Sequence, residues 1–150
     1  MDLILWRHAE AEVGAPDAAR KLTAKGEKQA QKMANWLKTR IAGPVRILAS
    51  PAIRAQQTAR ALSAKWATKA ELDVGASARQ ILGATGWPEA EGTVIVVGHQ
   101  PALGQLAASL LSSREAEWDI KKGAVWWFAA RVRGGGSETV LRAVIAPKDV

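Results

Sequence analysis

The segment Thr93–Val97 (TVIVV) is the sequence feature that most constrains the fold of this 150-residue chain. All of its residues are β-branched, and apolar side chains fall on both faces, without the polar alternation of a half-exposed strand. Such a strand is typical of the interior of a parallel sheet covered by helices. It ends at Gly98-His99, where polar residues follow the apolar run. The segment therefore predicts an α/β fold.

Other apolar segments alternate with amphipathic ones along the chain. Further strands are expected at Leu3–Trp6, Val45–Ala49 and, more weakly, Ala70–Val74. Helices are expected to begin at the N-cap residue Thr23, at Ser50-Pro51, at Ser77 and at Pro101. The alternation of strands and helices predicts a mainly parallel sheet with helices on both faces.

Two of these helices have boundaries that the sequence marks clearly. The apolar face of the first helix includes Ala30, Leu37 and Ile41, and Gly43-Pro44 is expected to stop it. In the second helix, the Ser50 side chain should cap free N–H groups and Pro51 should occupy the first helical position. Its apolar spacing continues as far as Trp66.

The pattern changes after Gly123. Two apolar-rich runs, Ala124–Val132 and Thr139–Ile145, lie on either side of a triple glycine and predict a C-terminal β-hairpin. Adjacent Trp126 and Trp127 should face opposite sides of the sheet. We therefore expect residues 1–150 to form a single α/β domain with a mixed sheet.

Composition excludes several functional classes. The absence of cysteine excludes disulfides, thiolate zinc sites and cysteine nucleophiles. No apolar run approaches the ~20 residues that span a bilayer, and the first residues lack the basic region of a signal peptide. We therefore expect a cytoplasmic protein with no membrane partner. The two histidines have no carboxylate at metal-ligand spacing, so neither a metal nor another cofactor is expected.

The chain is basic, with a formal net charge of +7. This charge favours an acidic or phosphorylated partner, although a solvated surface accounts for it as simply. Of the seven tryptophans, Trp36 and Trp66 fall in predicted helices and Trp126 and Trp127 in a predicted strand, and the sequence shows no basic-aromatic cluster. Nucleic acid is therefore not an expected partner.

Histidine and arginine side chains lie where predicted strands end. His8 and His99 each follow a strand, Arg7 precedes His8, and Arg54 lies in the first turn of a helix after another strand. The carboxyl ends of parallel strands form the ligand-binding edge of such sheets. Arginine forks and free N–H groups at helix starts both suit phosphate oxygens. The combination predicts a phosphate site with a histidine nucleophile.

In these motifs the sequence resembles the histidine phosphatase superfamily. The family's Arg-His-Gly signature appears as Arg7-His8-Ala9, and Gly98-His99 supplies the second histidine. Between them lie Arg20-Lys21-Leu22-Thr23 with Gly26, and Ser50-Pro51-Ala52-Ile53-Arg54-Ala55 with Gln57-Thr58. The order and spacing match over almost the whole chain. The short length resembles the SixA-type phosphohistidine phosphatases.

The resemblance implies a role for each motif residue. His8 would take the phosphoryl group, Arg7 and Arg54 would clamp its oxygens, and His99 would hydrogen-bond it. Arg20 would either line the pocket mouth or anchor its loop. Lys121 and Lys122 are expected to be surface charges, with active-site rim positions the less favoured alternative.

The sequence departs from the family pattern at two points. Ala9 replaces the glycine of the signature, which should crowd the backbone there. No carboxylate falls convincingly at the position of the family's acidic proton donor, since Glu71 and Asp73 are poor candidates. Imidazole leaves more readily than an alkoxide, so a missing acid favours phosphohistidine as substrate.

Three functions remain open. The first is removal of phosphate from phosphohistidine on a protein, either a histidine-phosphotransfer domain or a phosphotransferase-system carrier. The second is hydrolysis of small phosphomonoesters. The third is a module that binds a phosphorylated partner without turnover, which the complete set of arginines and histidines disfavours.

Overall fold

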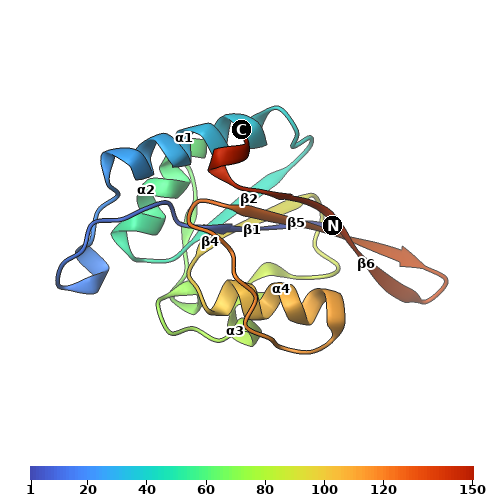
Figure 1. The fold of residues 1–150 in the computed structure, drawn as a ribbon. Coiled ribbons are helices and arrows are strands. Elements are labelled where there is room, and N and C mark those ends of the chain that lie inside the picture. The colour runs from blue at the N-terminus through green and yellow to red at the C-terminus, as the bar shows by residue number, and fades with distance from the viewer.

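The computed structural model describes all residues, 1–150, and contains one six-stranded sheet flanked by helices (Figure 1). The strand order is β3-β2-β4-β1-β5-β6. Strands β1 to β4 run parallel, and β5 and β6 are antiparallel to their neighbours. The strands are β1 (Asp2–Arg7), β2 (Val45–Ala49), β3 (Ala67–Thr68), β4 (Thr93–Gly98), β5 (Val125–Arg133) and β6 (Gly136–Ile145). The predicted mixed, mainly parallel α/β fold is confirmed.

Strand β4 occupies the interior position that its sequence predicts. It pairs in parallel with β1 on one side and β2 on the other, so Ile95 lies between Ile4 and Ile47. Every residue of β4 is buried. The strand needs no polar alternation because helices cover both of its faces.

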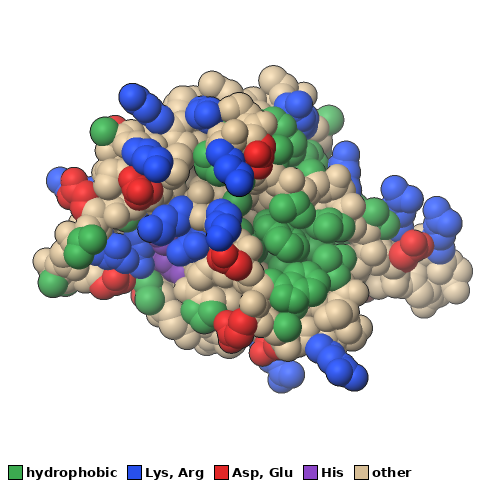
Figure 2. Space-filling view, in the orientation of Figure 1, with side chains coloured by type: hydrophobic (Ala, Val, Ile, Leu, Met, Phe, Trp, Pro, Cys, Tyr) green, Lys and Arg blue, Asp and Glu red, His purple; other side chains and the backbone are tan.

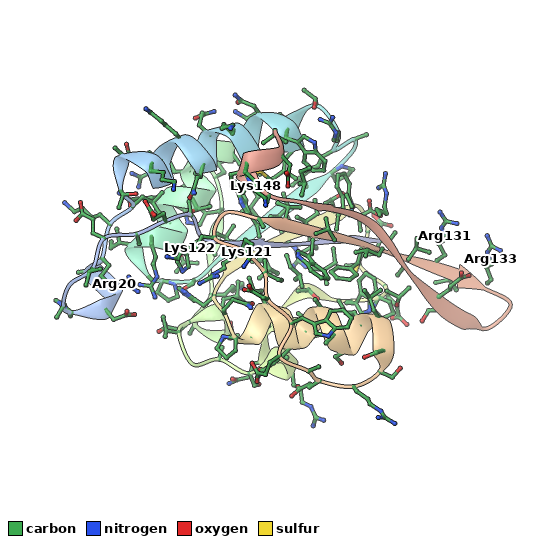
Figure 3. All side chains as sticks on the ribbon, viewed as in Figure 1. Arg20, Lys121, Lys122, Arg131, Arg133 and Lys148 are labelled. Carbon is green, nitrogen blue, oxygen red and sulfur yellow. The ribbon has the colours of Figure 1, made fainter.

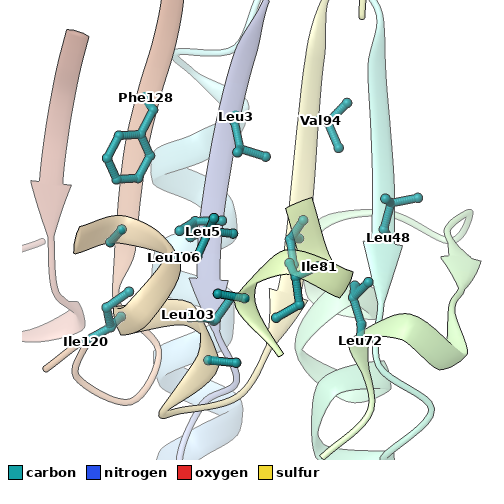
Figure 4. Close-up of a cluster of buried hydrophobic side chains, with 14 of the residues drawn as sticks. Leu3, Leu5, Leu48, Leu72, Ile81, Val94, Leu103, Leu106, Ile120 and Phe128 are labelled. Carbon is teal, nitrogen blue, oxygen red and sulfur yellow. The ribbon is translucent and has the colours of Figure 1, made fainter. Parts of the chain in front are cut away.

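Helices α1 (Ala24–Lys38) and α2 (Ile53–Leu62) cover one face of the sheet, and α3 (Ala78–Thr85) and α4 (Ala102–Ser112) cover the other (Figure 1). Successive residues of β1 alternate between these layers. Leu3 and Leu5 pack against α3 and α4 (Figure 4), whereas Ile4 and Trp6 pack against α1 and α2. Each fully buried aliphatic side chain contributes roughly 1.5–3 kcal/mol, so both layers hold the sheet rigidly. No helix is long and apolar enough to cross a membrane.

The C-terminal hairpin forms as predicted. Gly134 and Gly135 connect β5 to β6 with φ angles of 52° and 86°, a left-handed conformation that favours glycine. Trp126 packs on the α3/α4 side, and Trp127 on the α1/α2 side. Strand β5 pairs with β1 and therefore joins the hairpin to the parallel strands.

Two helix boundaries differ from the prediction. Helix α1 ends at Lys38, and Ile41 reaches the core from the following turn rather than from the helix. Helix α2 begins at Ile53, so Ser50-Pro51 precedes it, and it ends at Leu62, which leaves Trp66 outside. The Ser50 hydroxyl accepts from the Ala52 N–H at 3.2 Å instead of capping a helix that starts at Pro51.

The third predicted strand is also displaced. Only Ala67–Thr68 pairs with β2, and Ala70–Leu72 forms a 3-10 turn. The turn buries Leu72 in the core beneath α3 and α4. A single buried side chain at this position suits a turn as well as a strand, so the sequence pattern was ambiguous.

Candidate active site

The predicted site residues meet at the carboxyl edge of the parallel strands. His8 follows β1 and His99 follows β4, and these strands pair so that Arg7 lies opposite Gly98. Arg54 lies in the first turn of α2, after β2. These segments border a cavity of about 380 Å³. The cavity is lined by Arg7, His8, Ala11, Asp17, Arg20, Arg54, Val74, His99, Gln100 and Lys122.

His8 is buried in a fixed orientation. Its Nδ1 lies 2.7 Å from the Ala9 carbonyl oxygen, which can only accept, so Nδ1 carries the proton. Nε2 is therefore an acceptor, and it lies 3.3 Å from Arg54 Nε. Burial is the main cause that lowers the pKa of His8 to about 3, although the bond to Ala9 opposes the shift. The ring is neutral near pH 7, with a nucleophilic nitrogen directed at Arg54.

Ala9 fits the position where the family has glycine. Its N–H donates to Thr58 Oγ1 at 3.1 Å, and its side chain packs against Leu22 and Ala30. The methyl group is fully buried in this small cluster. The crowding expected from Ala9 is thus accommodated on the side of α1, away from the cavity.

His99 has the opposite tautomer. Its Nδ1 lies 3.5 Å from Arg54 Nη2, which can only donate, so Nε2 carries the proton and donates to Ser50 Oγ at 2.7 Å. The centroids of the His8 and His99 rings are 5.2 Å apart. Burial, followed by the charge of Arg54, lowers the pKa of His99 to about 4. Ser50, which the sequence predicted to cap a helix, therefore positions the His99 ring instead.

Arg54 connects both histidines to Asp17, in the loop that also carries Arg20. Its side chain is almost completely buried, and its Nη1 and Nη2 atoms donate to the carbonyl oxygen and the carboxylate of Asp17 at 2.9 and 3.0 Å. Arg54, followed by Arg20, lowers the pKa of Asp17 through hydrogen bonds. An anion that enters the cavity would compete with Asp17 for these donors.

Asp17 is the functional candidate that sequence reasoning missed. It lies in the 3-10 turn Asp17–Ala19, between β1 and α1, and the only signal was an acidic residue three positions before Arg20. Its contact with Arg54 joins residues 37 positions apart. Glu71 and Asp73, the carboxylates considered earlier, do not line the cavity. Asp73 instead accepts from the N–H of Val74.

Arg7 forms part of the cavity wall. Its Nη1 donates to the Ile120 carbonyl oxygen at 2.9 Å, while its Nε is buried without a hydrogen-bond partner. Burial is also the main cause that lowers its pKa. An unpaired buried N–H is costly, and a bound anion at this wall would satisfy it.

The mouth of the cavity is basic. Arg20 both lines it and anchors its loop, since it pairs with Asp17 at 3.0 Å and donates to the Glu12 carbonyl oxygen. Lys122 also lines the cavity, so the less favoured rim position is the one observed. Lys121 points to Asp119 at 2.7 Å. In Figure 2 the histidine surface is bordered by Lys and Arg side chains. No three His, Asp or Glu side chains gather where they could hold a metal ion.

The fold and the convergent histidines and arginines define a class of phosphoryl-transfer protein. Residues 3–80 match the family model of the histidine phosphatase superfamily (branch 1). The chain belongs to the histidine phosphatase superfamily, which confirms the resemblance predicted from its motifs.

Particular relatives lie among the SixA proteins. The phosphohistidine phosphatase SixA homolog of Haemophilus influenzae is 35% identical, with 76% of this chain and 79% of that protein covered. Phosphohistidine phosphatase SixA of Escherichia coli K12 is 32% identical, with 73% and 74% covered. A solved structure of the protein histidine phosphatase SixA complexed with tungstate matches with a TM-score of 0.76. It is 26% identical, and 99% of this chain and 98% of that chain are covered.

Proposed function

We propose that this protein is a phosphohistidine phosphatase that acts on a phosphorylated histidine of another protein, with His8 as nucleophile. The observation that carries the proposal is the neutral His8 ring, whose free Nε2 faces Arg54 inside a buried, arginine-lined cavity. The SixA names of its relatives support the choice of phosphohistidine as substrate.

In the first step, His8 Nε2 forms a bond to phosphorus and the bond from phosphorus to the substrate imidazole breaks. The substrate ring carries a proton on its other nitrogen, so it leaves as neutral imidazole. Arg54 turns its N–H groups from His8 and Asp17 to the phosphoryl oxygens, and Arg7 Nε donates to the same group. The phosphorylated His8 ring keeps its Nδ1 proton and gains positive charge. The Ala9 carbonyl, 2.7 Å from Nδ1, stabilises that charge.

In the second step, water attacks phosphorus and the bond to His8 Nε2 breaks, which releases phosphate and restores the neutral ring. His99 acts on the same oxygens. Burial, followed by the charge of Arg54, keeps the pKa of His99 low, although Asp73 and Asp17 oppose the shift. A phosphoryl dianion would raise that pKa, so His99 can then hold a proton for an oxygen or for the leaving group.

The ionised state of Asp17 favours a substrate that has a good leaving group. Asp17 is the only carboxylate that lines the cavity, and its low pKa keeps it ionised at neutral pH. It is therefore a poor proton donor for an alkoxide. An imidazole leaving group has an ordinary pKa near 6.5 and needs no strong acid. This argument favours phosphohistidine over small alkyl phosphomonoesters.

The substrate protein is proposed to be a histidine-phosphotransfer domain or a phosphotransferase-system carrier, and the expected cytoplasmic location belongs to the same proposal. The test compares phosphate release from both kinds of phosphorylated protein with release from aryl and alkyl phosphates of graded leaving-group pKa. We expect fast release from the proteins and a steep fall along the ester series. Brisk alkyl ester hydrolysis on a flat plot would favour a small-molecule phosphatase.

A radiolabelled phosphoryl donor provides a second check. The label should appear on wild-type His8 and then be released into water. Stable binding without release would favour the non-catalytic module.

A further inference from the structure

A second hollow of about 450 Å³ lies beside the candidate active site. Arg7 and Lys122 line both cavities, so the two lie side by side. The second hollow also contains Lys25, Lys121 and Lys148, and we call it the basic groove. None of these residues is needed for the chemistry proposed for His8.

Segments far apart in the sequence build the basic groove. Lys25 comes from the first turn of α1, Lys121 and Lys122 precede β5, and Lys148 lies in the final 3-10 turn. Figure 3 shows Lys121, Lys122 and Lys148 close together in front of the sheet, and Arg131 and Arg133 on the distant hairpin.

Gly123 holds these segments in fixed relation to the active site. Its N–H donates to the carbonyl oxygen of His8 at 3.0 Å, and its φ of 75° is left-handed. A Cβ here would lie 2.9 Å from Pro147 Cγ, which shows how closely the final turn packs on this loop. Lys122 therefore directly precedes a glycine that is hydrogen-bonded to the nucleophile's own residue, and Lys148 directly follows a proline that packs on that glycine.

The groove has more positive than negative charge. The carboxylate of Glu10 accepts from Thr23 Oγ1 at 2.7 Å, and Asp119 is paired with Lys121. Lys25, Lys122 and Lys148 have no ion-pair partner within the chain. Unpaired like charges repel one another, and an acidic surface placed over them would relieve that repulsion and speed association.

We infer that the basic groove is the docking surface for an acidic face of the phosphohistidine-bearing protein. The inference rests on the proposed function. The phosphohistidine of the partner protein enters the active-site cavity, while acidic side chains that flank this phosphohistidine lie over Lys25, Lys122 and Lys148. The adjacency of the two cavities and the positive charge of the groove both favour this partner, because a small phosphate ester would fill only the first cavity.

The test reverses charge in the groove at residues that do not line the active-site cavity. The variant is Lys25→Glu/Lys148→Glu, and the matched control is Arg131→Glu/Arg133→Glu on the hairpin, with the same change in net charge. The substrates are a histidine-phosphotransfer domain phosphorylated with phosphoramidate, and an aryl phosphate. Thermal melts establish that both variants are folded.

We expect kcat/KM on the phosphorylated domain to fall about tenfold or more in the groove variant at low salt, mainly through KM. The kcat/KM of the groove variant on this domain should also depend less steeply on salt concentration. The hairpin variant should stay within about twofold of wild type, because exposed charges far from the contact are largely screened. Both variants should hydrolyse the aryl phosphate at the wild-type rate.

An equal loss of kcat/KM on the phosphorylated domain in the two variants would mean that only net charge matters. That result would overturn the proposed docking surface. A matching loss on the aryl phosphate would also overturn it, because the groove would then act through the active site. If the groove variant loses binding to RNA or to anionic vesicles but keeps wild-type kinetics on the domain, the groove belongs to that other partner. A wild-type protein that releases no phosphate from any phosphohistidine protein refutes the proposed function instead.

Discussion

The floor and the rim of the candidate active site both carry charged or titratable side chains, but in opposite environments. The floor consists of His8, Arg54 and His99, which are 6%, 3% and 6% exposed. The rim includes Asp17, whose side chain is 53% exposed, and Arg20, whose side chain is 26% exposed. Floor contacts are buried hydrogen bonds, whereas rim contacts are ion pairs in water.

Because of this difference, the floor controls the phosphoryl-transfer chemistry and the rim controls substrate entry. Burial removes water from the floor, keeps both histidines neutral and strengthens every charge that acts on a phosphoryl group. Exposed ion pairs are worth only about 0–1 kcal/mol, so the rim can rearrange when a substrate arrives. Substitutions in the floor should therefore affect turnover strongly, and substitutions in the rim should affect binding modestly.

The largest expected effect is at the nucleophile. His8→Ala removes the atom that bonds to phosphorus, so kcat on an aryl phosphate should fall by about three orders of magnitude or more. Circular dichroism should show a folded protein, and vanadate should still bind to the remaining arginines. A rate above about a tenth of wild type would remove His8 from the proposed mechanism.

Arg54→Lys should lower kcat/KM about 100-fold, because a lysine ammonium keeps the charge but loses the planar fork that reaches both histidines and the phosphoryl group. Arg60→Lys, in the same helix α2 but exposed, is the matched control and should be close to wild type. Near-normal activity of Arg54→Lys would mean that Arg54 supplies only charge.

The buried histidines should make stability depend on pH. Their pKa values, about 3 for His8 and about 4 for His99, lie below the unfolded value near 6.5. The unfolded state therefore binds more protons as pH falls, and stability that is present above pH 6.5 is lost toward pH 4. Each ring should contribute roughly 2 kcal/mol to this loss between pH 7 and pH 4.5. Urea unfolding across that range measures it.

NMR can measure the pKa of each native histidine separately, because the chain has only two histidines. Neither ring of the native protein should titrate between pH 5.5 and 8. A midpoint near 6.5 for either ring would show that the floor is more hydrated than its burial indicates.

The smallest effect is expected at the rim. Asp17→Asn removes the carboxylate that competes for Arg54, so vanadate affinity should rise by about three- to tenfold. Asp119→Asn, which removes the exposed partner of Lys121, is the control and should change affinity less. Unchanged or weaker vanadate binding in Asp17→Asn would show that Asp17 supports anion binding instead of opposing it.

The sequence was sufficient for the parallel core and for much of the floor. Strand β4 is apolar on both faces, which requires an interior position whatever the loops do. His8, His99 and Arg54 could be expected to converge, because each follows a strand and carboxyl ends of parallel strands share one edge. These conclusions depend on local pattern and on a general rule of sheet topology.

The rim and the positioning residues depended on contacts that no local pattern encodes. Ser50 looked like a helix cap, yet its hydroxyl accepts from His99, 49 residues away. Asp17 looked like a loop residue, and its role depends on the 3-10 turn that brings it to Arg54. The local pattern was enough to show which side chains follow the strands. Which loops return to those side chains could be seen only in the folded chain, because the long-range hydrogen bonds that fix a loop have no period in the sequence.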